Sequence, residues 1–80
     1  MQIKSVAKNQ TELSITKKGI DYIILFSYET PVAVVKDWTG YKTITKYSST
    51  TTKHINQFFS RQAISDIETV PQHEIDNIIK

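Results

Sequence analysis

The feature that most constrains the fold of this chain is a change of hydrophobic period near Tyr47. Before Tyr47, apolar residues alternate with polar ones or fill short runs such as Ile20–Tyr28, which is typical of β-strands. After it, Ile55, Phe58 and Phe59 recur at helical spacing and share one face of a helical wheel. The sequence therefore predicts a block of strands followed by helices.

The strand block, about residues 2–47, is expected to form an antiparallel meander of four to five strands. Gly19 follows two lysines and Gly40 follows Asp37-Trp38-Thr39, so both glycines are expected in tight turns. β-Branched and aromatic residues occupy both faces of Ile20–Tyr28. That strand is predicted to lie centrally, covered on both sides, or covered on one side with aromatic side chains exposed on the other.

Two helices are predicted after the strands, over about residues 50–62 and 70–79. Ser48, Ser49 or Thr50 can cap the first helix by accepting a hydrogen bond from a free backbone N–H. Thr69 and Gln72 have the spacing of a capping box at the second helix, and a loop or short turn is expected between the two. Because an antiparallel sheet needs a cover, both helices are predicted to pack on one face of it. The fold class is α+β, in a single domain of residues 1–80.

The composition limits the class of protein. Eighty residues make one domain, and 39% hydrophobic residues are enough for a folded core. The absence of cysteine excludes disulfides and thiolate metal sites. The N-terminus has no signal-peptide pattern, and the longest apolar run, Tyr22–Phe26, is far below the ~20 residues of a membrane span. A soluble protein of the cytoplasm, with no membrane contact, is therefore expected.

The sequence carries no catalytic or metal motif. No serine lies in a Gly-x-Ser-x-Gly elbow, and two glycines are too few for a Walker loop or a dinucleotide fingerprint. His54 has no acidic residue three or four positions away, and the acids near His73 lie on different sides of its helix. We therefore expect no enzymatic activity, no cofactor and no metal.

The start of the first helix is the best candidate site. Hydroxyl groups, free backbone N–H groups and a cation meet there, and this combination can hold a phosphate, a carboxylate or a protein partner. The alternative is a redundant helix cap with a strand-to-helix turn. The candidate residues for anion or partner binding are Ser49, Thr50, Thr51, Lys53, His54 and Arg61.

The aromatic residues suggest a second kind of surface. Trp38 lies in a turn and is expected to be exposed, so Trp38 and Tyr41 are the candidates for a protein interface. Tyrosines near Lys36 and Lys42 also allow stacking of nucleic-acid bases on a sheet face. The net charge of +2 is too small to argue for nucleic acid, although residues 1–61 alone carry +5. The alternative is that the aromatic rings cover the core and the sheet edges.

Two strings, SYETPVA (residues 27–33) and YSSTTTKHINQF (residues 47–58), resemble a family of small uncharacterised proteins of bacteriophages, prophages and mobile elements. The similarity covers most of residues 11–60. The resemblance implies a phage-type accessory protein in a bacterial cytoplasm, which acts by binding a host or defence protein. The hypothesis is a non-enzymatic protein-binding module, with a homodimer as one form of it. The alternative is a nucleic-acid, nucleotide or anion binder that uses the Ser/Thr-rich helix start and adjacent lysine and arginine.

Overall fold

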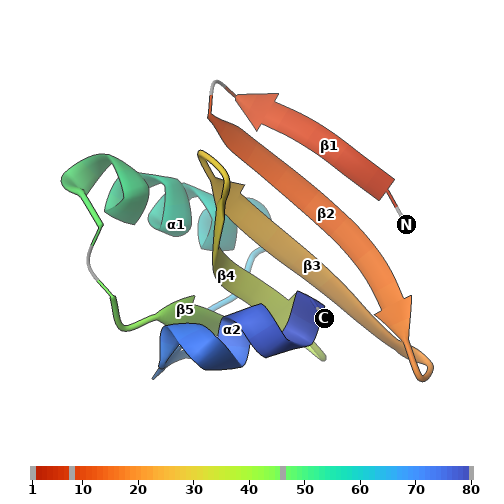
Figure 1. Cartoon of the computed structure of the whole chain (residues 1–80). Helices are drawn as coiled ribbons and strands as arrows, with labels where there is room; N and C mark the ends of the chain where they lie inside the picture. Colours follow the sequence, from red (N-terminus) through yellow and green to blue (C-terminus); the bar gives the residue numbers. More distant parts are fainter. Residues whose placement is uncertain (1, 8, 46, 80) are drawn as a thin grey trace.

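A six-stranded sheet with two helices forms the protein (Figure 1). The computed structural model describes residues 2–7, 9–45 and 47–79. The strands lie in chain order, with β1 to β5 antiparallel to their neighbours and β6 parallel to β5. The elements are β1 (Gln2–Ala7), β2 (Gln10–Lys17), β3 (Ile20–Ser27), β4 (Thr30–Lys36), β5 (Thr39–Thr43), α1 (Ser49–Arg61), β6 (Ile67–Val70) and α2 (Gln72–Ile79). The α+β class and the meander followed by two helices are confirmed.

Two-residue turns join the hairpins from β2 to β5. Lys18 and Gly19 both have positive φ (52° and 77°), and so do Asp37 and Trp38 (49° and 66°). Positive φ at both central residues is the pattern of a type I′ turn, whose twist matches that of the strands it joins. Gly19 therefore lies in a turn as predicted.

Gly40 lies inside β5, where it pairs with Val35, so its prediction as a turn residue is wrong. It has no positive φ. A Cβ atom built on Gly40 would lie 2.5 Å from Cε1 of Phe59. A side chain at this position would therefore force Phe59 to shift, because α1 approaches the sheet closely here.

The central strand β3 is covered by α1 on one face and in part by α2 on the other, where Phe26 lines an open hollow, so each alternative for Ile20–Tyr28 holds in part. Leu25 and Ile24 point to opposite faces, and both are fully buried. On one face, Leu25 packs with α1 residues such as Ile55 and Phe58. On the other, Ile24 packs with Ile75 of α2. The expected sharing of one sheet face by the two helices is therefore wrong, since α1 and α2 cover opposite faces (Figure 1).

The position of strand β6 explains why the two helices cover opposite faces of the sheet. The segment between the helices was expected to be a loop or a short turn, but Ile67–Val70 pairs with β5 in parallel. A parallel pair needs a crossover connection, and α1 supplies it across one face of the sheet. After β6 the chain is at the sheet edge, and the apolar residues of the other face are still uncovered. Helix α2 packs on that face.

Candidate functional site

Ser48 caps α1, which decides between the three predicted capping residues. Its backbone is extended (φ −163°, ψ 166°), and its Oγ accepts a hydrogen bond from the backbone N–H of Thr51 at 3.1 Å. The carbonyl of Ser48 accepts from the N–H of Thr52. Part of the hydroxyl run is thus used to start the helix.

Thr51 and His54 face the sheet and not the solvent. Their exposed fractions are 5% and 7%. The Oγ of Ser27, at the end of β3, lies 2.8 Å from Nδ1 of His54 and 3.2 Å from Oγ1 of Thr51. The ring of Tyr28 lies beside that of His54, with 6.1 Å between centroids. His54, a candidate for anion or partner binding from the sequence, is therefore not at the surface, and a polar partner on β3 makes its burial possible.

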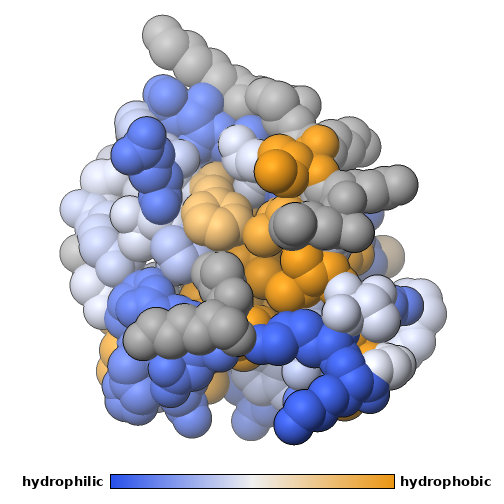
Figure 2. All heavy atoms as spheres, turned by 45° about the vertical axis from the view of Figure 1, so that its right-hand side comes forward, coloured by the Kyte–Doolittle hydropathy of each residue, from blue (hydrophilic) through white to orange (hydrophobic). Residues whose placement is uncertain are grey.

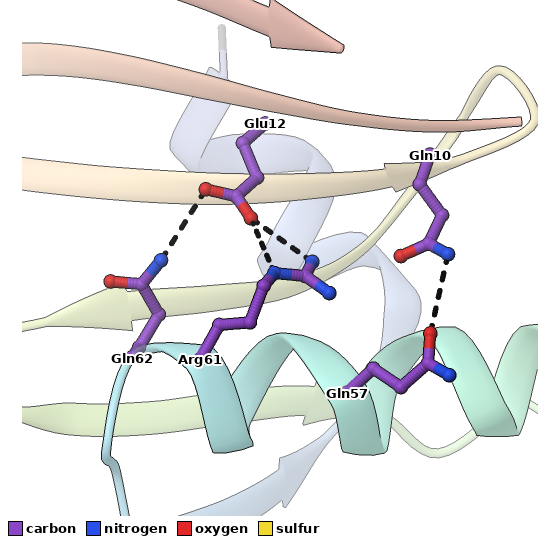
Figure 3. A network of polar contacts seen from close by, with 5 residues as sticks. All are labelled: Gln10, Glu12, Gln57, Arg61 and Gln62. Atoms are coloured by element: carbon purple, nitrogen blue, oxygen red, sulfur yellow. Dashed lines mark hydrogen bonds and ion pairs between the residues drawn. The ribbon is translucent and has the colours of Figure 1, made fainter. Parts of the chain in front are cut away.

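Arg61 belongs to a polar bridge between α1 and β2 (Figure 3). Its Nη2 and Nε donate to Oε2 of Glu12 at 3.0 and 3.2 Å, and Gln62 donates to Oε1 of the same carboxylate at 3.3 Å. Gln10 donates to Gln57 nearby at 3.4 Å. Arg61 lies twelve positions after Ser49, which corresponds to about 18 Å along the helix. Arg61 therefore lies too far away to share a ligand with the helix start.

Three of the six predicted helix-start residues remain at the surface. Ser49, Thr50 and Lys53 are exposed, whereas Thr51 and His54 bond inside the fold and Arg61 bonds to Glu12. The structure therefore does not bring the predicted set together at one accessible point.

The two predicted interface aromatics are separated. Trp38 is 80% exposed in the β4–β5 turn, as the sequence predicted. Tyr41 is half-buried and packs under α2 against Ile24, Val34 and Ile75. Trp38 borders a hollow on the α1 side of the sheet, so the two rings do not form one patch.

A surface that the sequence did not reveal lies on the α2 side of β1, β2 and β3. Helix α2 has eight residues, about 12 Å in length, and packs on β4 and β5. Six strands span about 24 Å, so α2 leaves part of the face bare. There Ile3, Leu13, Phe26 and Tyr28 line a shallow hollow of about 290 Å³. We call these four residues the open sheet face, and Figure 2 shows hydrophobic side chains gathered over this side of the molecule.

The alternation of Leu13 and Ile15 with polar residues could have indicated the open sheet face. Such alternation ordinarily leaves the polar side of an antiparallel strand in the solvent. In the structure that side faces α1, and Glu12 is nearly buried there. The apolar side is the one that is partly open.

Among the described residues, no helix is long and apolar enough to cross a membrane. No curated protein and no solved structure matches the chain. One family, described as "Family of unknown function (DUF8033)", matches residues 1–77. Because this match spans nearly the whole sequence, the chain belongs to the DUF8033 family.

Proposed function

We propose that this chain is a small non-enzymatic accessory protein that binds a partner protein through the open sheet face. The observation that carries the proposal is the 73% exposure of Ile3 beside the half-buried Leu13 and Phe26. Apolar residues scattered singly over a surface are ordinary, but a group of them around a hollow is typical of a binding site. Burial of this group by a partner would remove apolar surface from water.

The shape of the open sheet face favours a protein partner with an apolar anchor. Its hollow is shallow and has room for a single bulky side chain. Tyr28 at its edge is half exposed and presents an aromatic ring, a common anchor at protein interfaces. Thr11 and Glu29 supply a polar rim. An apolar centre with a polar rim is the usual anatomy of such interfaces.

The biological setting of the proposal rests on the resemblance of the two sequence strings to proteins of bacteriophages and prophages. In that setting the protein acts in the bacterial cytoplasm on a host or defence protein. A second copy of the chain is the other protein partner, and it would make the open sheet face the interface of a homodimer.

The proposal is tested with Ile3→Glu and a matched control, Ile44→Glu. Ile44 is 65% exposed but does not line the open sheet face. The wild type and both variants are used as baits in a bacterial lysate, and the bound proteins are quantified. We expect a protein that is retained by the wild type and Ile44→Glu and is lost with Ile3→Glu. Equal retention by all three baits, or no retained protein for a chain that is also monomeric in sedimentation, would contradict the proposal. Sedimentation of the purified chain separates the two kinds of partner, since a homodimer would dissociate in Ile3→Glu alone.

The alternative function, binding of nucleic acid or another anion at the start of α1, has fewer residues available to it. Lys53 is the one cation of the predicted set that is exposed and not bonded to a carboxylate. A single phosphate contact predicts weak binding with a slight dependence on salt. A titration of the chain with nucleotides and single strands at low salt tests it, and the absence of binding would remove this alternative.

A further inference from the structure

The turn that carries Trp38 borders a second hollow, of about 350 Å³, on the α1 side of the sheet. Its apolar lining residues are Ile23, Val35 and Ile64. Asp21, Asp37, Gln62 and Trp38 also line it and supply two carboxylates and an indole. Asp21 accepts a hydrogen bond from the hydroxyl of Thr16 at 2.6 Å, which orients its carboxylate.

The charge at this hollow is opposite to that of the whole chain. The chain carries +2, whereas, within the part of the chain that the structure describes, the residues lining the hollow include two acids and no lysine or arginine. The nearby cations are directed elsewhere or lie outside the lining. Lys36 lies over the ring of Tyr22 on the other face, Arg61 pairs with Glu12, and Lys18 is in the neighbouring turn.

We propose that this hollow binds an arginine side chain of a partner protein. Tryptophan is the best aromatic partner for a cation, and a planar guanidinium can stack on the indole. The carboxylates of Asp21 and Asp37 can accept its N–H groups, and charge-assisted hydrogen bonds of this kind are strong. The apolar lining residues can accommodate the methylene stem of the arginine. This site lies on the opposite side of the sheet from the open sheet face, and it does not depend on the function proposed for that face.

The single tryptophan of the chain makes the hollow directly observable, because intrinsic indole fluorescence comes from Trp38 alone. The probe is N-acetyl-arginine-N-methylamide, with the citrulline analogue as a neutral control of nearly the same shape. We expect the arginine probe to change the fluorescence with a Kd of about 1 mM, as suits a single side chain. The response should weaken as salt is raised, because the Debye length falls below 10 Å above about 0.1 M. An equal response to citrulline would overturn the proposal.

Three variants assign the binding to the named carboxylates. Asp37→Asn removes a charge and keeps a residue that tolerates positive φ, so the turn should persist. Asp21→Asn removes the other charge and retains an oxygen for Thr16. We expect each to weaken the arginine probe about threefold or more. Glu29→Gln, an exposed acid in the β3–β4 turn, should leave binding unchanged. Wild-type affinity in both Asp variants would overturn the proposal, and Ile3→Glu should bind the probe normally whatever its effect on the open sheet face.

Discussion

Gly40 lies directly beneath the ring of Phe59, with no room between them for a methyl group. A side chain at Gly40 would require the ring, and with it α1, to move away from β5. Overpacking of this kind costs typically 1–3 kcal/mol. We therefore expect Gly40→Ala to lower the free energy of unfolding by about 2 kcal/mol, measured by urea denaturation.

A second substitution separates this packing effect from a general loss of glycine. Phe59→Leu shortens the side chain that meets Gly40, so the double variant should be less destabilised than the sum of the two single variants. Simple additivity would show that the contact with Phe59 is not the cause.

The cap of α1 gives a prediction that distinguishes neighbouring serines. Ser48 accepts the N–H of Thr51, and Ser49 is the exposed first residue of the helix. Ser48→Ala should therefore reduce stability by about 1 kcal/mol, the usual value of an N-cap. Ser49→Ala should change it by less than about 0.5 kcal/mol. Thermal or urea unfolding of the two variants provides the comparison, and equal effects would place the cap elsewhere in the hydroxyl run.

The buried hydroxyl of Ser27 holds the start of α1 against β3. Its removal in Ser27→Ala leaves Nδ1 of His54 without its partner and takes one partner from Thr51. An unsatisfied buried polar group costs about 1–3 kcal/mol, so a loss in that range is expected. The control is Ser14→Ala, because Ser14 lies in β2 on the same face of the sheet as Ser27 and is only half-buried. A change below about 0.5 kcal/mol in Ser27→Ala would mean that water replaces the lost bond.

The salt bridge between Glu12 and Arg61 joins a nearly buried carboxylate to a more exposed guanidinium, so losing the guanidinium should lower the stability of the fold. Glu12 is nearly buried, whereas about a third of the Arg61 side chain is exposed. Arg61→Ala leaves the Glu12 carboxylate in the fold with only the hydrogen bond from Gln62, so we expect a loss of about 1–3 kcal/mol. Lys53→Ala, which removes an exposed cation from the same helix, should have almost no effect. Equal stability of the two variants in urea would show that Glu12 is hydrated and not dependent on Arg61.

The hydrophobic period of the sequence was sufficient to predict the strands of the meander and the two helices, but not which face of the sheet each helix covers. The burial of Thr51, Ile55, Phe58 and Phe59 follows from helical spacing alone, and the central position of β3 follows from its two apolar faces. The faces covered by the helices depend on contacts between distant segments. Glu12 and Arg61 are 49 residues apart, and nothing near Glu12 in the sequence indicates that its side of β2 is covered.

For the candidate site, too, local features could be predicted from the sequence and contacts between distant segments could not. The hydroxyl run does begin a helix, because capping is a local interaction that sequence reveals. The burial of His54 was not predictable, since it depends on Ser27, which lies 27 positions earlier and on another strand. Strand β6 was missed because its four residues are mostly exposed and carry no alternation that a strand reading requires.

Substitution of Trp38 should abolish binding of the arginine probe without lowering stability. Its φ of 66° is unfavourable for a bulky residue, and the second position of a type I′ turn favours glycine. Because 80% of the side chain is exposed, Trp38→Gly loses few contacts and should leave the free energy of unfolding unchanged or raise it by up to about 1 kcal/mol. The same variant should no longer bind the arginine probe. Because it has no tryptophan, binding is measured from the NMR chemical shifts of the Asp21 and Ile64 amides. A marked loss of stability would mean that the indole supports the fold, and binding that persists in Trp38→Gly would remove the indole from the site.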